Sequence, residues 1–367
     1  MSLSSVIQWS NLSAQIISRS SSSIRRFSVR HHCRQSAADA SATSIAASFL
    51  SRFRSLGPQT RSQVLDANQL QLLSLTLNRP SLYPNSPSLS NTSTSLPTGT
   101  PLPPGYHLAY FTPAFLENEL GADGTDVSYN PEAPFTRRMW AGGEVHWPRA
   151  ADGNPNPLRV GQEVQETTKV LSSEPKIVRK TGEEMIVVGV EKEFRNEHGV
   201  AVIDRRNWVF RKALAVPYIS STTRVPAPLS TAPAFSSTSS TEKTHTRTLR
   251  QTAITLFRFS ALTFNPHKIH YSTPWAQQVE GHRDIVVHGP LNLISILDLW
   301  RDTRPMKGDD PALMLPESIT YRATSPLFAE DEYQVVLNEE EGSGTGLVRI
   351  FAPGGKVAMK AEVRSAK

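Results

Sequence analysis

Cysteine is almost absent from this chain of 367 residues, because Cys33 is the only one. It lies in an N-terminal segment that we expect to be removed, so the mature protein would contain no thiol. This excludes disulfides, cysteine-based metal sites and cysteine nucleophiles. No uncharged apolar run reaches the roughly 18 residues of a membrane-spanning helix, so no membrane span is expected.

Acidic residues are absent from residues 1–38, which contain five arginines. These arginines account for five of the six net positive charges of the chain, so the remainder is almost neutral. The rest of the sequence has no stripe of Lys and Arg interleaved with aromatic residues. Nucleic acid is therefore not an expected partner.

The same N-terminal segment is rich in Arg and Ser, and its apolar residues fall on one side of a helix: Trp9, Leu12, Ile16 and Ile17. This pattern is typical of a mitochondrial transit peptide. Arg26-Phe27-Ser28 resembles a site for matrix processing. We therefore predict a transit peptide over residues 1–40 and a location in the mitochondrial matrix; a disordered basic tail is the alternative.

Three polar stretches predict loops or disorder: the N-terminus to about residue 50, residues 80–104, and residues 216–248. The third is a linker rich in Ser, Thr and Pro, with little apolar material for a core. It divides the chain into an N-terminal half over residues 60–215, which contains the polar insertion 80–104, and a C-terminal half over residues 249–367.

The first half contains signals for a helix and then for strands. A helix is expected to begin near Leu65–Leu73, with Asp66 as its N-terminal cap. Met185–Glu191 and Val202–Arg211 predict strands, and Asn196–Gly199 predicts the hairpin between them.

The second half predicts one buried helix followed by strands. Thr252–Phe259 alternates as a strand does, and Pro290 occupies a favoured first position of a helix. That helix is apolar on nearly every side, so it must be buried all round. Four strands are then expected, at Ser318–Ala323, Tyr333–Leu337, Gly346–Phe351 and Val357–Val363. Such an order implies an antiparallel sheet curled around the helix; a generic α+β domain is the alternative.

The residues that suggest chemistry lie just before this helix. Asn265, His267 and His270 fall within six residues, and His288-Gly289 opens the helix eighteen residues after His270. Histidine is a suitable general base near neutral pH. The free N–H groups at the start of a helix stabilise negative charge on a carbonyl oxygen. Together they suggest proton abstraction beside a thioester carbonyl.

A metal site is a weaker interpretation of the histidines at 267, 270, 282 and 288. Their spacing is not that of two histidines four apart on a helix, and no carboxylate or thiol completes a ligand set. No Gly-rich phosphate loop lies between a strand and a helix, so nucleotide binding is also disfavoured.

Five segments carry a family resemblance: Pro103–Phe111 (PPGYHLAYF), Leu120–Gly124 (LGADG), Arg137–Gly143 (RRMWAGG), Thr263–Ser272 (TFNPHKIHYS) and His288–Leu291 (HGPL). The last two, with Ala276 between them, resemble the hotdog-fold MaoC-like (R)-specific hydratases and dehydratases. All five look like the signatures of the fungal mitochondrial 3-hydroxyacyl-thioester dehydratase type 2 family, whose bacterial relatives include mesaconyl-C4-CoA hydratases. The resemblance covers about residues 60–367, without the two polar insertions.

The resemblance implies an α+β double hotdog, with two antiparallel sheets each wrapped around a central helix and a catalytically silent N-terminal half. The family's catalytic histidine corresponds to His270, while its usual aspartate is replaced by Thr263. We expect His270, His267, Asn265 and the Gly289 N–H to be catalytic. His288, Arg137, Arg138 and Trp140 are expected to contact the substrate or order the loop. No dissociable cofactor and no metal are expected.

The function implied is dehydration of (3R)-3-hydroxyacyl thioesters, on acyl carrier protein or CoA, in mitochondrial fatty acid synthesis. The protein would be a monomeric pseudo-dimer or a homodimer. Two alternatives stay open. One is a hydratase of short-chain or dicarboxylic CoA thioesters, of the mesaconyl type; the other is an acyl-thioester-binding subunit without activity.

Overall fold

The computed structural model describes residues 41–92, 95–150, 152–179, 181–213, 234–304, 314–340 and 342–366. The predicted transit peptide over residues 1–40 lies outside these ranges, as do residues 216–233 of the predicted linker. No described helix is both long enough and apolar enough to cross a membrane.

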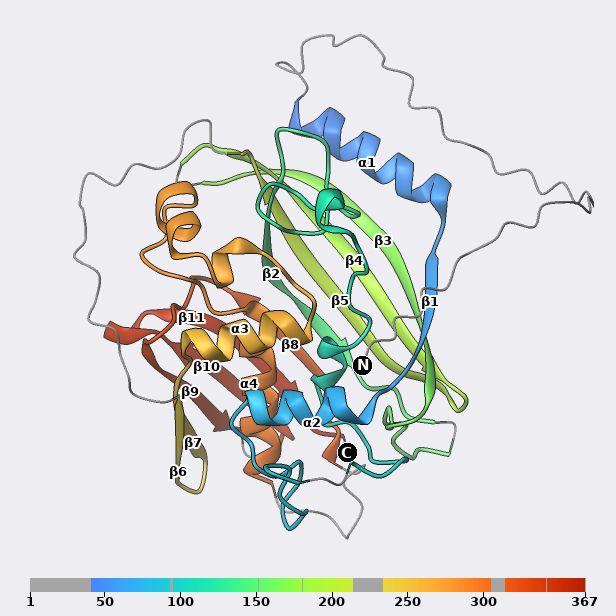
Figure 1. Cartoon of the computed structure of the whole chain (residues 1–367), viewed down its shortest axis with the longest axis vertical. Helices are drawn as coiled ribbons and strands as arrows, with labels where there is room; N and C mark the ends of the chain where they lie inside the picture. The colour runs from blue at the N-terminus through green and yellow to red at the C-terminus, as the bar shows by residue number, and fades with distance from the viewer. Residues whose placement is uncertain are drawn as a thin grey trace, which may run out of the picture. The chain divides into compact units, whose positions relative to one another are not determined.

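All the strands that the structure describes form one antiparallel sheet (Figure 1). Its order is β1-β3-β4-β5-β2-β8-β11-β10-β9-β7-β6. The strands of the N-terminal half are β1 (Gln59–Val64), β2 (Arg137–His146), β3 (Glu163–Ile177), β4 (Glu184–Asn196) and β5 (Gly199–Arg211). Those of the C-terminal half are β6 (Phe235–Ser240), β7 (Thr244–Arg250), β8 (Ser318–Ala323), β9 (Glu332–Glu339), β10 (Thr345–Phe351) and β11 (Val357–Arg364).

The two halves join where β2 pairs with β8, from Gly142 opposite Arg322 to His146 opposite Ser318. This corrects the expectation of two separate sheets, since main-chain hydrogen bonds continue across the junction. The junction needs small residues on β2. A Cβ on Gly142 would lie 2.5 Å from the Tyr321 carbonyl oxygen of β8, so a larger residue would push β8 away.

The C-terminal half has the long buried helix that was predicted. α4 (Gly289–Asp302) lies on the face of β8–β11, and every residue from Leu291 to Arg301 is buried (Figure 1). The four strands predicted after it are confirmed, as is the hairpin at Asn196–Gly199. The N-terminal half differs, because no long described helix runs buried along its strands. Instead α1 (Ala42–Leu56) packs on β3 and β4, and α2 (Ala67–Thr76) begins at its predicted cap Asp66.

Three local predictions were wrong. Thr252–Phe259 is not a strand but the start of α3 (Ala253–Leu262), whose buried residues Thr255, Leu256, Phe259 and Ser260 follow helical spacing. Disorder up to residue 50 is contradicted by α1, whose Ile45, Phe49 and Phe53 pack on the sheet. The end of the predicted linker is ordered, because β6 and β7 form a hairpin that pairs with β9 at the sheet edge.

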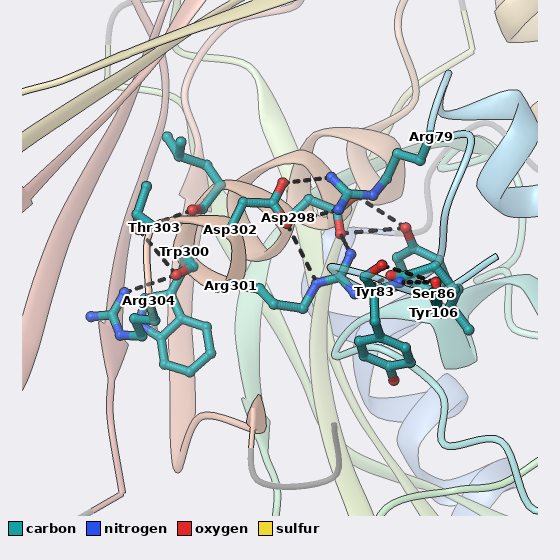
Figure 2. Close-up of polar contacts among 12 residues, drawn as sticks. Arg79, Tyr83, Ser86, Tyr106, Asp298, Trp300, Arg301, Asp302, Thr303 and Arg304 are labelled. Carbon is teal, nitrogen blue, oxygen red and sulfur yellow. Dashed lines mark hydrogen bonds and ion pairs between the residues drawn. The ribbon is translucent and has the colours of Figure 1, made fainter. Parts of the chain in front are cut away.

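A buried cluster of charges ties the two halves together at the C-terminal end of α4 (Figure 2). The Arg301 side chain has no exposed surface, and it donates hydrogen bonds to Asp298 Oδ1 at 2.8 Å and to the Leu82 carbonyl at 2.7 Å. Arg79, next to the polar insertion, pairs with Asp302 at 2.6 Å. This cluster therefore holds the N-terminal half against α4.

Replacing Arg301 with methionine is expected to lower the free energy of unfolding by roughly 3–5 kcal/mol, because Asp298 would stay buried with its main cation removed. Urea unfolding followed by tryptophan fluorescence measures this change. The control is Arg364→Met, whose ion pair with Glu362 lies on the surface and should matter by less than about 1 kcal/mol. Equal stability of the two variants would contradict a structural role for the cluster.

Candidate active site

A cavity of about 1490 Å³ lies between the loop Thr263–Ser272 of the C-terminal half and the sheet of the N-terminal half. Six of the eight predicted site residues line it: Asn265, His267, His270, Gly289, Arg138 and Trp140. Arg137 and His288 do not. The tertiary structure therefore gathers residues more than 100 positions apart around one space.

His270 ends a 3₁₀ turn, Lys268–His270, and is 7% exposed. Its Nδ1 lies 2.7 Å from the Val286 carbonyl oxygen. A carbonyl can only accept, so Nδ1 carries the proton and Nε2 keeps its lone pair. Burial, together with nearby His267, lowers the pKa of His270 to about 3. The ring is thus held as a neutral imidazole, the form that accepts a proton.

The ring of His288 is stacked on the ring of His270. The two imidazoles are stacked, with centroids 3.6 Å apart and planes 18° apart, and His288 Nε2 hydrogen-bonds to Ser260 Oγ at 2.9 Å. His288 is 1% exposed, and burial lowers its pKa well below the usual value. His288 does not line the cavity, and its stacking on His270 restrains that ring; its contact with substrate stays a prediction.

His267 and Asn265 stand beside His270. The His267 ring meets that of His270 edge to face, with ring centroids 5.4 Å apart, and the side-chain Oδ1 of Asn265 accepts a hydrogen bond from the main-chain N–H of His267 at 3.3 Å. Burial, reinforced by Arg138, lowers the pKa of His267 to about 3. A carboxylate lies close by: Asp123 Oδ2 is 3.7 Å from His267 Nε2.

Asp123 was missed in the sequence, where it belongs to the LGADG signature. The loop has Thr263 at the position where the resembling family has its aspartate. The Thr263 hydroxyl donates a hydrogen bond to the Phe259 carbonyl at 2.7 Å and so caps the end of α3. The loop thus carries no acid of its own, and the N-terminal half supplies one from a distant position. The sequence does not indicate this pairing, since Asp123 and His267 are 144 positions apart and their contact depends on how the halves pack.

Gly289 begins α4, with His288 as the residue before it. The first N–H groups of a helix have no partner inside the helix, and they favour anions. A Cβ on Gly289 would lie 2.1 Å from Trp140 Cε3, so only glycine lets the indole ring cover the start of the helix. Trp140 therefore packs against the start of α4, and it also packs on Tyr321 with ring centroids 5.0 Å apart.

The two predicted arginines have different environments. Arg138 lines the cavity, pairs with Asp126 at 3.1 Å and lies over the Trp208 ring at 5.2 Å. Although burial opposes it, the Arg138 guanidinium holds the pKa of Asp126 below its usual value. Arg137 does not line the cavity and pairs with Glu280 at 2.5 Å, so its contact with substrate stays a prediction.

Asn292 is a further residue that the sequence did not indicate. It lies one turn into α4, lines the cavity, and is 8% exposed. Its Oδ1 is buried without a hydrogen-bond partner among the described residues. An unsatisfied buried acceptor is costly, so a donor group of a bound molecule would stabilise this position. Within the described ranges, no group of three or more His, Cys, Asp or Glu side chains is arranged to hold a metal ion.

The buried histidines predict that stability falls in acid. The pKa values of His267 and His270 are about 3 in the folded protein, against 6.5 for an ordinary histidine. Between these values the unfolded chain binds more protons, so the free energy of unfolding decreases as the pH falls from about 6.5 towards 3. Urea midpoints at pH 7 and pH 4.5 measure this decrease.

Carboxylates whose pKa is lowered in the folded protein also reduce the free energy of unfolding as the pH falls. The contribution of His270 is therefore measured by comparing variants with the unchanged protein. His270→Asn is expected to show a smaller decrease than the unchanged protein. His198→Asn, at a side chain that is 65% exposed, should leave the decrease as it is. Identical pH dependence in the two variants would mean that His270 titrates normally in the folded state.

Comparison with known proteins finds related sequences and structures. The chain matches the family described as hydroxyacyl-thioester dehydratase type 2 over residues 105–329, more than half of its length. It is 31% identical over 234 residues to a mesaconyl-C(4)-CoA hydratase of Chloroflexus aurantiacus, covering 62% of this chain and 72% of that protein. It is 26% identical over 265 residues to a mitochondrial hydroxyacyl-thioester dehydratase type 2 of Schizosaccharomyces pombe, covering 65% and 79%.

Solved structures show the same fold at low sequence identity. A MaoC-like dehydratase from Phytophthora capsici superposes with a TM-score of 0.54 at 16% identity, covering 85% of this chain and 95% of that one. HtdX from Mycobacterium tuberculosis gives 0.51 at 13% identity, covering 84% and 99%. Together with the extent of the family match and the presence of its signatures around one cavity, these findings lead to one conclusion: the chain belongs to the hydroxyacyl-thioester dehydratase type 2 family.

Proposed function

We propose that this protein is a hydro-lyase that dehydrates (3R)-3-hydroxyacyl thioesters to trans-2-enoyl thioesters and catalyses the reverse hydration. One observation carries the proposal: a neutral imidazole, His270, and the start of α4 at Gly289 line the same cavity. A proton acceptor and an oxyanion donor facing one space are what elimination beside a thioester carbonyl requires. The (3R) configuration comes from the family resemblance.

The reaction can be written from these groups. His270 Nε2 takes the C2 proton, and the negative charge that develops on the thioester oxygen is stabilised by the Gly289 N–H. The electron pair of the broken C2–H bond forms the C2–C3 double bond, and the C3–O bond breaks. The departing hydroxyl receives a proton and leaves as water, so hydroxyacyl thioester becomes enoyl thioester and water.

The second proton-transfer group is assigned to His267, with Asn265 orienting the hydroxyl or a water. His267 lies beside His270 and faces Asp123, whose carboxylate would stabilise a protonated imidazole. Asn265 cannot itself exchange protons as a carboxylate does. This division of roles replaces the aspartate that the loop lacks at Thr263.

The cellular setting and the carrier belong to the proposal as well. We place the protein in the mitochondrial matrix, which the acid-free, Arg-rich N-terminus and the mitochondrial relative in Schizosaccharomyces pombe support. The substrate would be carried on acyl carrier protein or on CoA. Because one chain contributes both halves of the site, it can act as a monomeric pseudo-dimer or within a homodimer. Fatty acid synthesis is the setting that plain acyl chains would imply.

One assay distinguishes the proposed function from two alternatives. The relative from Chloroflexus aurantiacus suggests hydration of short or dicarboxylic CoA thioesters, and the missing loop aspartate suggests a subunit that only binds acyl thioesters. Protein without residues 1–38 is offered crotonyl and longer trans-2-enoyl thioesters on CoA and on carrier protein, and hydration is followed by loss of the enoyl absorbance. We expect hydration that His270→Ala abolishes.

Binding of thioesters without turnover on any carrier would instead identify a binding subunit. A fluorescent fusion to residues 1–50 tests the location separately, and a cytosolic signal would remove the matrix assignment.

A further inference from the structure

A turn of the N-terminal half contacts the loop Thr263–Ser272, which carries His267 and His270. We call residues 120–125 the docking turn. The turn and the loop are far apart in the chain and come from different halves. Two hydrogen bonds, one ion-type contact and one close approach of main chains connect them. The position of the two histidines therefore depends on the half that was expected to be catalytically silent.

The docking turn keeps its shape through hydrogen bonds of its own. The Gly121 N–H donates to the Thr125 carbonyl at 2.8 Å, and the Gly124 N–H donates to the Gly121 carbonyl at 2.8 Å. Asp123 Oδ1 accepts from the Thr125 N–H at 2.9 Å and from the Thr125 hydroxyl at 2.8 Å. Thr125 is 2% exposed, so these bonds are shielded from water. The turn is thus a preformed surface for the loop.

Lys268 joins the loop to this surface twice. Its main-chain N–H donates to the Asp123 carbonyl at 2.8 Å, and its side-chain Nζ donates to the Ala122 carbonyl at 2.7 Å. The Lys268 ammonium also lies over the Trp275 ring of the C-terminal half, 4.5 Å from the ring centroid. Hydrogen bonds from a charged donor are among the stronger ones in proteins. Lys268 therefore connects two neighbouring carbonyls of one half to a loop of the other.

Gly124 allows the turn and the loop to come this close. Its φ is +84°, and a Cβ at this position would lie 2.2 Å from the Pro266 carbonyl oxygen. Both the backbone conformation and the lack of space exclude a side chain here. Pro266 directly precedes His267, so the close approach fixes the main chain just before that histidine.

The loop has a second anchor in its own half. The Val286 N–H donates to the Ile269 carbonyl at 2.8 Å, and the Val286 carbonyl oxygen lies 2.7 Å from His270 Nδ1. His270 is thus positioned mainly through Val286. His267 is the histidine next to Lys268, and its position is the one that the docking turn determines.

The same turn presents a carboxylate to His267. Asp123 Oδ1 is engaged by Thr125, while Oδ2 lies 3.7 Å from His267 Nε2. Asp123 does not line the cavity, so it can act on the reaction only through His267. Its carbonyl is also the one that accepts from the Lys268 N–H. One residue therefore both holds the loop and faces the histidine.

We propose that Lys268 is a positioning residue, which holds the loop on the docking turn and so sets His267 against Asp123. This rests on the proposed function, because it concerns how the second proton-transfer group of that reaction is held. Lys268 itself transfers no proton, since its Nζ is bound to the Ala122 carbonyl. The N-terminal half then controls the turnover rate through this contact.

The first test removes the charged donor. In Lys268→Met, kcat for hydration of a trans-2-enoyl thioester is expected to fall roughly tenfold, as for a lost hydrogen bond from a charged group, while KM changes little. Lys268→Arg should recover most of kcat, because a guanidinium can donate to the same carbonyl. Lys268 also lines the cavity, so a rise in KM with unchanged kcat would show that it binds the carrier and would overturn the proposal.

The matched control is Lys169→Met, which should leave kcat and KM as they are. Lys169 pairs with Glu191 at 3.8 Å on the sheet of the N-terminal half and does not line the cavity. A loss in this variant equal to that in Lys268→Met would mean that removing any such lysine affects kcat, and the specific role of Lys268 would be refuted.

A double-variant cycle with Asp123→Asn tests the route of the effect. If Lys268 acts by holding Asp123 against His267, Lys268→Met should cost at most about a further twofold in kcat once the carboxylate is gone. A loss that is as large in the Asp123→Asn background as in the unchanged protein would show that Lys268 acts by another route, contrary to the proposal.

Hydrogen exchange separates the positioning role from the activity, because it needs no substrate. In the full chain, the amides of residues 266–272 are expected to exchange several-fold faster in Lys268→Met than in the unchanged protein or in Lys169→Met. This result in a protein that hydrates no enoyl thioester supports the positioning contact, and the proposed activity fails alone. Equal exchange in all three proteins, with hydration intact, refutes the positioning role and leaves the activity in place.

Discussion

His270→Asn is expected to lower kcat/KM for hydration of an enoyl thioester by about 10²–10⁴-fold, the range typical for loss of a general base. Asparagine preserves the local structure better than alanine does, because its amide can donate to the Val286 carbonyl as Nδ1 of His270 does. It cannot take a proton from carbon. A large loss of activity in a protein of near-normal stability would therefore isolate the chemical role of the imidazole.

A control substitution is needed because the His270 ring is stacked on that of His288. His288 lies 3.6 Å behind His270, so a disturbed ring position could also reduce activity. His198→Asn serves as the matched substitution, at an exposed histidine in the β4–β5 hairpin. If His270→Asn keeps more than about a tenth of the activity, the proton acceptor lies elsewhere, and His267 becomes the first candidate.

Gly289→Ala is expected to lower kcat by about 10²–10³-fold, the typical cost of losing one oxyanion donor. The added Cβ would lie 2.1 Å from Trp140 Cε3, so either the ring or the start of the helix must move. α4 is buried from Leu291 to Arg301 and has no room to shift as a whole. The first turn would therefore distort, and overpacking of this kind typically costs a further 1–3 kcal/mol of stability.

A double variant distinguishes a displaced N–H from a generally damaged fold. In Gly289→Ala with Trp140→Leu, the smaller side chain removes the clash, so stability and part of kcat should return. Steady-state kinetics and urea unfolding of the two single variants and the double variant form a complete cycle. Unchanged kcat in Gly289→Ala alone would show that the start of α4 does not hold the thioester oxygen.

Local patterns in the sequence predicted those elements whose burial follows from their own residues. α4 is apolar on nearly every side and carries Pro290 at its start, so its position and its burial were correct. The strands after it were found because their apolar residues alternate and are bounded by turns. Failures occurred where two periodicities compete: Thr252–Phe259 alternates like a strand, yet Thr252 caps a helix whose buried residues form two adjacent pairs, 255 and 256 and then 259 and 260, one turn apart.

The histidines proposed as catalytic could be singled out from the sequence because they lie on one short loop, and the structure brings His270, His267, Asn265 and Gly289 to one cavity. The family signature around Arg137 was equally visible, but it could not show that Arg138 turns towards the cavity and Arg137 towards Glu280. Which side of a strand a residue occupies depends on register, and the irregular pairing between Trp140 and Gly142 alters the register within β2.

The sequence by itself determined which candidate groups stand on the loop and at the helix start, because six consecutive residues and one helix boundary contain them. Only the tertiary structure decided the rest of the site. It joined the halves into one sheet through β2 and β8, placed Asp123 beside His267, and bound Lys268 to the Ala122 carbonyl. These contacts join residues far apart in the chain, and such pairings are set by packing between the two halves rather than by any local pattern of residues.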